Sequence, residues 1–351
     1  MTYGGDAWHA LGLLAPAIWI TAFAVNFAAI ALLLPILRHA ALAARTARSL
    51  HRTPTPQWGG VVVVATTLAI AVLVDMVLRP EPGLSVHAGT VFGAALLLLV
   101  LGAVDDVLVL GVVPKILAQA AAVGVVIWSL PHIARLLPFA PPWAENTILF
   151  VAVLWFVNLV NFMDGLDWMM VAEVVPVTAG LAVLAWLGAL PTQGLVVGLA
   201  LNGAMLGFAP FNRPIARLFL GDMGSLPIGL LLGWLLLLVA TTGHLAAAVL
   251  LPLYFVADAS LTLFRRLRVG ERVWQGHRSH FYQRAVDKGM RNEAIVARIF
   301  LVNLGLAAMA ALSVTIDAPI ASGLIVALGA ALVAWLLADL ARGGKQNAIA
   351  I

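Results

Sequence analysis

The segment MGSLPIGLLLGWLLLLVAT, Met223–Thr241, contains no ionisable side chain and is as long as a helix that crosses a lipid bilayer. A helix needs about 20 apolar residues to span the hydrocarbon core, where no water pairs with backbone groups. The segment therefore predicts a transmembrane helix. It follows Gly221-Asp222 directly, so that helix would hold an aspartate at the membrane surface.

The rest of the chain repeats this pattern. Of 351 residues, 63% are hydrophobic and 10% are charged, and the mean hydropathy is +1.04. Soluble domains carry about 25% charged residues. We expect an all-α polytopic membrane protein, one integral-membrane domain over residues 1–351 with about eleven transmembrane helices (ten or eleven). The other expected spans are Leu11–Leu37, Gly60–Leu78, Ala88–Val104, Pro114–Leu130, Thr147–Phe162, Met169–Leu190, Leu195–Phe208, Leu245–Phe264, Ala294–Val314 and Ile320–Leu340.

Basic residues predict the orientation. If the N-terminus lies outside, all of the 20 Lys and Arg except Arg79 and Arg135 fall in cytoplasmic segments. Cytoplasmic loops carry an excess of these residues. We therefore expect the N-terminus in the periplasm and the C-terminus in the cytoplasm. The formal charge of +4 then marks a membrane face, and we expect no nucleic-acid partner. The first apolar stretch lacks a basic leader, so we expect a retained span.

Polar motifs gather in five segments expected on the cytoplasmic side, near 38–59, 105–114, 162–168, 209–222 and 265–293. The chain has no cysteine, which excludes disulfides, thiolate catalysis and zinc–thiolate sites. In the first segment, Thr53 and Thr55 lie among prolines and glycines and are candidates to contact phosphate. The alternative is a simple basic turn.

The second segment contains Asp105 and Asp106 at the end of an apolar run, with Lys115 after them. Two adjacent carboxylates there are costly unless a cation compensates them. One could face a metal while the other orients it or acts as a base. The alternative is a helix end exposed to water.

The third segment carries Asn158 and Asn161, which share one face if the helix continues, and then Asp164 and Asp167. Buried amides in a span are costly unless they are paired or used. We expect this string to bind a ligand. For Asn158 alone, interhelical packing is an open alternative.

The fourth segment runs from Asn212 through Arg217 to Asp222, which opens the span quoted first. Free N–H groups at a helix start suit phosphate, and an aspartate oxygen there suits a hard cation. The alternative is a helix N-cap supplied by Asp222 or Ser225.

The fifth segment contains Arg265, His277, Arg278 and His280 within a basic stretch. Such a stretch can simply mark the cytoplasmic side of the membrane, or it can bind anionic lipid. Without cysteine or a nearby carboxylate cluster we do not expect zinc, and phosphate recognition is the favoured reading. Acidic groups for Mg²⁺ and basic groups for phosphates on one membrane face are the requirements of phosphoryl transfer.

The motifs TPTPQWGG, Asp105-Asp106, NLVNFMDGLD, FNRPIARLFLGDMGS and HRSHFYQR follow one another between residues 51 and 284. In this order they resemble the polyprenyl-phosphate N-acetylhexosamine-1-phosphate transferases, the superfamily that includes phospho-MurNAc-pentapeptide translocase. The resemblance implies an enzyme of the bacterial inner membrane with a cytoplasmic active site. It would transfer a sugar 1-phosphate from a UDP-N-acetylhexosamine to undecaprenyl phosphate, release UMP, and use Mg²⁺, with Mn²⁺ as a substitute.

The resemblance also implies roles. Asp222 would be the principal Mg²⁺ ligand, with Asp106 and Asp164 as further candidate ligands, and Asp105 would be a candidate base supported by Asp106. The expected substrate-binding residues are Thr53, Thr55, Lys115, Asn158, Asn161, Asp164, Asp167, Asn212, Arg217, Arg265, His277, Arg278 and His280.

Two departures bear on the sugar. The late run His277-Arg278-Ser279-His280 differs from the HHHFE and HIHH forms of two branches and resembles the O-antigen-initiating branch, which uses N-acetylated 6-deoxyhexosamines. Trp168 stands where the DGxDG motif has its last glycine. A member using UDP-GlcNAc or UDP-MurNAc-pentapeptide is an alternative, as are a polyprenyl-lipid transporter, which would place charge inside its spans, and a membrane scaffold. The sequence leaves open whether the chain forms a homodimer.

Overall fold

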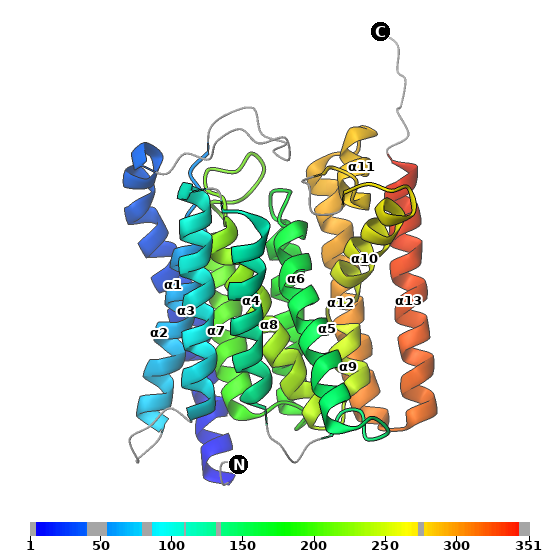
Figure 1. Cartoon of the computed structure of the whole chain (residues 1–351). Coiled ribbons are helices and arrows are strands. Elements are labelled where there is room, and N and C mark those ends of the chain that lie inside the picture. Colours follow the sequence, from blue (N-terminus) through cyan, green and yellow to red (C-terminus); the bar gives the residue numbers. More distant parts are fainter. Residues whose placement is uncertain are drawn as a thin grey trace.

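The computed structural model describes residues 5–40, 55–78, 86–108, 110–130, 135–272 and 277–343 (Figure 1). These residues form 13 helices, which confirms the all-α class. The helices are α1 Gly5–Ala40, α2 Gly59–Leu78, α3 Val86–Leu108, α4 Val112–Trp128, α5 Pro142–Met163, α6 Met169–Trp186, α7 Thr192–Phe208, α8 Asp222–Thr241, α9 Leu245–Leu250, α10 Leu253–Arg268, α11 Phe281–Asp287, α12 Asn292–Ile316 and α13 Pro319–Arg342.

The chain is a multi-pass membrane protein. Within the described ranges, 8 helices are long and apolar enough to cross a bilayer, namely α1, α2, α3, α5, α6, α8, α12 and α13. The apolar helices α4 and α7 are shorter. In Figure 1 most of these helices run side by side along one direction. Which end faces the cytoplasm stays a prediction.

One expected span is not continuous. The run Leu245–Phe264 was expected to be a single helix, and the structure divides it into α9 and α10. The break falls at Leu251-Pro252, because proline has no N–H for the helical ladder and its ring clashes with the preceding turn. The second half, α10, carries Asp258 and Arg266 buried against the other helices.

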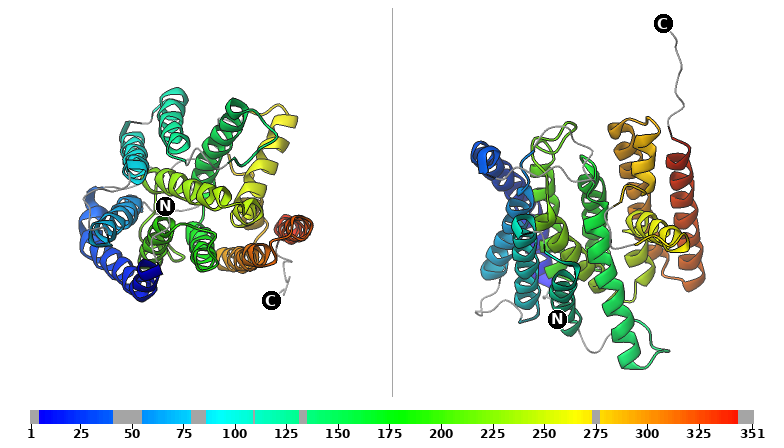
Figure 2. Two further views of the ribbon diagram at one scale, coloured as in Figure 1. Left: turned by 90° about the horizontal axis from the view of Figure 1, so that it is seen from below. Right: turned by 45° about the horizontal axis from the view of Figure 1, so that its top comes forward.

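The helix α8 lies at the centre of the bundle, as the view along the helices shows (Figure 2). Every residue from Met223 to Ala240 is buried. The helices α2, α3, α5 and α9 pack against it. Because α8 begins at Asp222, this aspartate lies in the middle of one end of the bundle.

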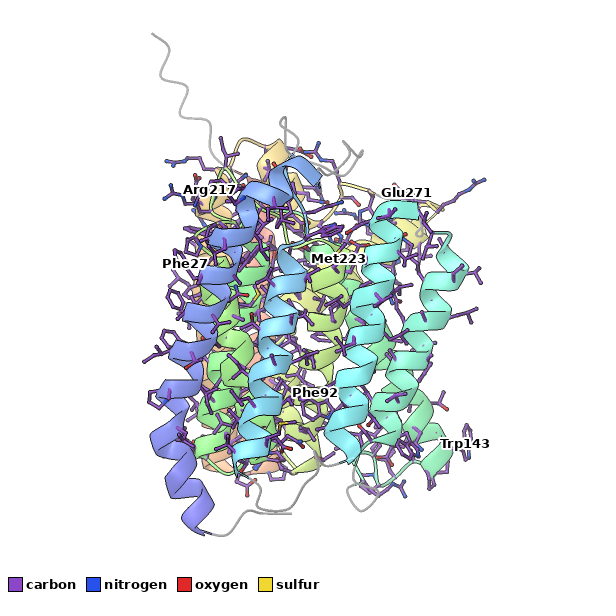
Figure 3. All side chains as sticks on the ribbon, turned by 90° about the vertical axis from the view of Figure 1, so that its left-hand side faces the viewer. Phe27, Phe92, Trp143, Arg217, Met223 and Glu271 are labelled. Carbon is purple, nitrogen blue, oxygen red and sulfur yellow. The ribbon has the colours of Figure 1, made fainter. Side chains whose placement is uncertain are left out.

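The polar segments share that end. Figure 3 places Arg217, Met223 and Glu271 towards one end of the helices and Trp143 at the other. The segments 209–222 and 265–293 therefore lie on the same side as the start of α8. This agrees with the expectation that the motifs gather on one face. Residues 41–54, including Thr53, lie outside the described part of the chain.

Candidate active site

Two glycines let neighbouring helices reach the start of α8. A Cβ at Gly102 in α3 would stand 2.6 Å from the carbonyl carbon of Asp222. A Cβ at Gly60 in α2 would stand 2.7 Å from the carbonyl oxygen of Leu220, and the Gly60 amide donates to that oxygen (2.9 Å). Only a residue without a side chain allows this approach. The aspartate pair, one turn after Gly102, is thereby fixed beside the start of α8.

Asp106 brings an unpaired carboxylate oxygen to this point. Its Oδ2 is buried and has no hydrogen-bond partner in the structure. A Cβ at Gly221 would stand 3.5 Å from the same oxygen, and the charges of Asp222 and Asp105 act on the Asp106 carboxylate. A buried acceptor without a partner is costly, so this oxygen is a candidate to bind a cation or a ligand.

Asp222 does not cap its helix. The N-cap of α8 is Gly221, with φ +75°, and no side chain caps the helix. The N-cap alternative is therefore wrong for Asp222 and Ser225. Asn161 instead donates to Asp222 Oδ1 (2.9 Å) and to Ser225 Oγ (2.9 Å). The helix α5 ends at Met163 and so includes Asn161, which meets the condition for Asn158 and Asn161 to share one face.

Asp164 follows directly after α5 and is half-buried. Burial, and then the nearby charges of Asp222 and Asp167, raise the pKa of the Asp164 carboxyl to about 7. Asp222 therefore acts electrostatically on both Asp106 and Asp164. A cation placed among these groups would favour the ionised form of each.

Asp105 is satisfied within the protein. Lys115 Nζ forms an ion pair with Asp105 Oδ2, and the Leu110 amide donates to Oδ1 (2.7 Å). The carboxylate is buried, at 9% exposure, so the alternative of a helix end exposed to water is wrong for Asp105. The pair joins α3 to α4 across the turn between them.

The residues present fit a hard cation. No group of three or more His, Asp or Glu side chains converges among the described residues. A Mg²⁺ site does not require such a group, because Mg²⁺ is usually bound through one or two carboxylates together with waters and substrate phosphates. Asp222 and the unpaired oxygen of Asp106 offer such a set of oxygen donors.

Two predicted binding residues hold loops together. Asn212 Oδ1 accepts from the Trp168 amide (2.8 Å), and Asn212 Nδ2 donates to the Leu218 carbonyl (3.0 Å). Asp167 Oδ2 accepts from the Ala216 amide (3.1 Å). These bonds tie the segment after α5 to the segment before α8, so Asn212 and Asp167 shape the site even where they touch no ligand.

Trp168 explains a departure from the family motif. Its backbone is left-handed, with φ 64°. Glycine adopts this conformation without steric cost, which accounts for the glycine usually found there. In this chain the indole Nε1 donates to the Ala209 carbonyl (2.7 Å) and the amide donates to Asn212. These contacts stabilise a conformation that is unusual for a bulky residue.

The remaining predicted residues divide between packing and the site surface. Asn158 Nδ2 donates to Gln119 Oε1 (2.8 Å) and so joins α5 to α4. This contact is the interhelical packing that was left open as the alternative role of Asn158. Thr55 is buried. Arg217 is exposed, with its guanidinium carbon 5.5 Å from the ring centre of Phe211.

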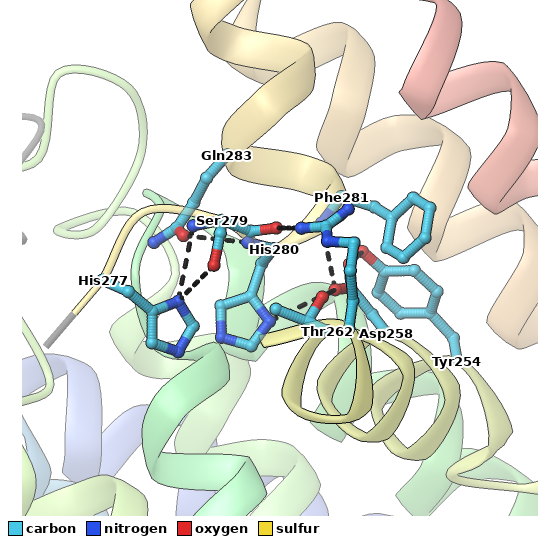
Figure 4. Close-up of polar contacts among 9 residues, drawn as sticks. Tyr254, Asp258, Thr262, His277, Ser279, His280, Phe281 and Gln283 are labelled. Atoms are coloured by element: carbon cyan, nitrogen blue, oxygen red, sulfur yellow. Dashed lines mark hydrogen bonds and ion pairs between the residues drawn. The ribbon is translucent and has the colours of Figure 1, made fainter. Parts of the chain in front are cut away.

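The late basic loop is ordered around its histidines (Figure 4). The rings of His277 and His280 lie 4.8 Å apart. Arg265 Nη2 donates to the Ser279 carbonyl (2.6 Å), so α10 holds the loop. Arg278, at the loop surface, pairs with Asp287 (3.1 Å).

Sequence reasoning missed two residues beside this loop. Asp258 lies 3.2 Å from His280 Nδ1, and Tyr282 has a fully buried hydroxyl without a partner. The available signal for Asp258 was a carboxylate within an apolar run, where ionisable residues are usually functional. Tyr282 lies within the motif HRSHFYQR, but the sequence pattern gave it no role of its own.

The sequence is similar to those of known membrane transferases. The sequence profile of glycosyl transferase family 4 matches residues 88–240. The chain is 28% identical over 291 residues to the decaprenyl-phosphate N-acetylglucosaminephosphotransferase of Mycobacterium tuberculosis strain H37Rv, covering 72% of this chain and 71% of that protein. It is 27% identical to the protein of the same name from Mycolicibacterium smegmatis, over 88% of this chain and 84% of that one. It is 23% identical to the probable undecaprenyl-phosphate N-acetylglucosaminyl 1-phosphate transferase of Bacillus subtilis strain 168, over 81% of each.

Proposed function

We propose that the chain, whose residues 88–240 match glycosyl transferase family 4, is a member of the polyprenyl-phosphate N-acetylhexosamine-1-phosphate transferase superfamily and transfers an N-acetylhexosamine 1-phosphate from a UDP-sugar to undecaprenyl phosphate. An oxygen of the lipid phosphate bonds to the β-phosphorus of the UDP-sugar. The bond from that phosphorus to the bridging oxygen breaks, and UMP leaves. The observation that carries the proposal is that the buried Oδ2 of Asp106, which has no hydrogen-bond partner, lies beside Gly221 at the start of α8, where Asn161 from α5 donates to Asp222 Oδ1 (2.9 Å).

The carboxylates would hold Mg²⁺, or Mn²⁺ in its place, with Asp222 as principal ligand and Asp106 and Asp164 as further candidates. When bound, the ion neutralises charge on the diphosphate. Asn161 orients Asp222 through the bond to Oδ1 (2.9 Å). Asp105 is the candidate base for the acceptor phosphate, and Lys115 holds its carboxylate in place through an ion pair.

The basic end of the bundle would bind the nucleotide and the diphosphate. His277 and His280 flank the diphosphate, and Arg265 orders their loop through Ser279. Because Lys and Arg concentrate in the segments that carry the motifs, this end would face the cytoplasm of a bacterial inner membrane.

The sugar is proposed from the form of the late loop. The run HRSH, residues 277–280, resembles the O-antigen-initiating branch, which favours a UDP-N-acetyl-6-deoxyhexosamine and a role at the start of surface polysaccharide synthesis. UDP-GlcNAc is the second candidate, because the similar proteins are named for N-acetylglucosamine. A pocket that merely replaces a polar contact by apolar surface discriminates by only about 10² in rate.

The test is to mix the purified protein with undecaprenyl phosphate, Mg²⁺ and a panel of UDP-sugars, and to identify the lipid product by mass while UMP release is followed. We expect a lipid-linked sugar diphosphate and a higher kcat/KM for a 6-deoxy sugar than for UDP-GlcNAc. A preference for UDP-GlcNAc would reject the branch and keep the reaction. Lipid movement without UMP release would favour a transporter.

The matched variants are Asp222→Asn and Asp317→Asn. The first changes the central carboxylate, and we expect it to lower kcat by at least about 10³, as losing a catalytic metal contact does. The second changes a turn aspartate between α12 and α13 that is left-handed, with φ 45°, a conformation that asparagine tolerates. Equal activity of the two variants would reject the metal assignment.

A further inference from the structure

Donors from α10 itself and from the start of α11 converge on the carboxylate of Asp258, which is fully buried in α10 (Figure 4). Its Oδ1 accepts from the Phe281 amide (3.0 Å) and from the Thr262 hydroxyl (3.3 Å). Its Oδ2 accepts from the Tyr254 hydroxyl (3.2 Å). An amide can only donate, so Oδ1 serves as an acceptor.

His280 completes this set. Its Nδ1 lies 3.2 Å from the same Oδ1 of Asp258. A carboxylate oxygen has no hydrogen to give, so this contact is a hydrogen bond when the hydrogen of the imidazole is on Nδ1. The other ring nitrogen, Nε2, is then the one that can meet a ligand. Asp258 thus determines which nitrogen of His280 is presented.

The ring plane of His280 is also fixed. The side chain is 3% exposed and has two other rings close to it. The ring centre of His277 is 4.8 Å away, and the Tyr282 ring stacks on the imidazole at 5.7 Å with an interplanar angle of 15°. With Nδ1 at Asp258 and these rings against it, the buried imidazole is held in one orientation, and Nε2 is the ring nitrogen left for a ligand.

We propose that Asp258 is a positioning residue for the transfer reaction: it fixes His280 with the hydrogen on Nδ1 and aims Nε2 at the diphosphate of the UDP-sugar. This proposal rests on the proposed function. The physical reason is that a carboxylate hydrogen-bonded to one imidazole nitrogen sets the tautomer and orientation of the other, as in hydrolase triads and metal sites. The competing role is structural, in which Asp258 only anchors the start of α11 through the Phe281 amide.

The first variant is Asp258→Asn, which keeps the size of the side chain and removes its negative charge. If its NH2 group takes the place of Oδ1, it donates to His280 Nδ1 and imposes the other tautomer, and the bond from the Phe281 amide, which ends on the same atom, is lost as well. The comparison with a His280 variant below therefore separates the two roles. We expect kcat to fall by about 10² or more, since tautomer loss in a triad costs about 10⁴. The KM for the UDP-sugar and the melting temperature in detergent should change little. The control is Thr262→Val, which removes another donor to Oδ1 and should keep kcat within about threefold.

A double-mutant cycle gives the decisive measurement. The variants are Asp258→Asn, His280→Gln and the two combined, each assayed with the same UDP-sugar and lipid. If Asp258 acts through His280, Asp258→Asn has no further effect once His280 is replaced. Equal fold-losses in both backgrounds, or a fall in kcat that tracks a fall in melting temperature, would overturn the positioning role.

The wild-type protein distinguishes this failure from that of the proposed function. A wild type that makes lipid-linked product while the cycle is additive rejects only the role of Asp258. A wild type that makes no lipid-linked product from any UDP-sugar rejects the proposed function, and the positioning role with it.

Discussion

Gly102 of α3 lies against the backbone of Asp222 so closely that a Cβ at position 102 would stand 2.6 Å from the Asp222 carbonyl carbon. Backbone atoms cannot rotate away as the end of a long side chain can. This contact sets how far α3 lies from the start of α8, and therefore how far the aspartate pair of α3 lies from Asp222.

The first prediction follows from that contact. Gly102→Ala should force α3 away from α8, at a cost of about 1–3 kcal/mol in the free energy of unfolding, as overpacking does. We also expect kcat to fall by more than the loss of folded protein explains, because Asp105 and Asp106 on α3 would move away from Asp222. The control is Gly93→Ala on the same helix, where nothing lies within 4 Å of the added methyl group. Melting temperature and kcat of the two variants are compared, and a Gly102→Ala protein as active as Gly93→Ala would contradict the assigned geometry.

The second prediction separates the two aspartates of α3. Asp106 has an unpaired oxygen suited to a cation, whereas Asp105 is occupied by Lys115 and Leu110. Asp106→Asn should lower activity in a way that raised Mg²⁺ partly restores, because a weakened ligand can be offset by mass action. Asp105→Asn should be severe and should not recover.

Initial rates over a Mg²⁺ titration test this pair. Full recovery of Asp105→Asn at high Mg²⁺ would make Asp105 a ligand and not the base. Failure of Asp106→Asn to recover at any concentration would remove Asp106 from the proposed metal site.

The sequence predicted the helices well because membrane spans depend on local composition. Length and apolar content are visible in any window such as Met223–Thr241, and lipid admits few alternatives to a helix. The exception, Leu245–Phe264, contains Pro252, a local signal whose effect depends on whether neighbouring helices accommodate a break. Here the chain turns into α10, which carries Asp258.

The site was predicted in part. Residues that bear the chemistry stood out because carboxylates and amides are rare at the ends of apolar runs. The sequence did not show which of these residues contact one another, because those contacts join segments that are far apart in the chain. Asp258 and His280 are 22 positions apart, and Asn161 lies 61 positions from Asp222. The left-handed backbone of Trp168 was not predicted either: the glycine of the family motif at this position was its one sign, and a tryptophan gives none.

The third prediction concerns Gly165 and Tyr282. A Cβ at Gly165 would overlap the buried Tyr282 hydroxyl and stand 3.3 Å from the ring carbon that bears it. Tyr282 stacks on His280, so it cannot move without disturbing the late loop. Gly165→Ala should therefore lower the melting temperature, by the equivalent of about 1–3 kcal/mol.

The compensating change is Tyr282→Phe, which removes the overlapping oxygen. Alone it should leave stability nearly unchanged or raise it, because that hydroxyl is buried without a partner. Combined with Gly165→Ala it should restore most of the lost melting temperature. If the changes in melting temperature of Gly165→Ala and Tyr282→Phe simply add in the double variant, the segment after α5 and the late loop are not in direct contact.

The last prediction is the orientation in the membrane. The native chain has no cysteine, so single cysteines can be introduced without background. Arg272→Cys replaces an exposed residue beside Glu271, and Trp143→Cys replaces a side chain that is 73% exposed at the opposite end of the bundle (Figure 3). The distribution of Lys and Arg places the first in the cytoplasm and the second outside. In intact cells an impermeant thiol reagent should label Trp143→Cys and spare Arg272→Cys, while both should label once the membrane is opened. Labelling of Arg272→Cys in intact cells would reverse the orientation and place the carboxylates at the start of α8 away from the cytoplasm.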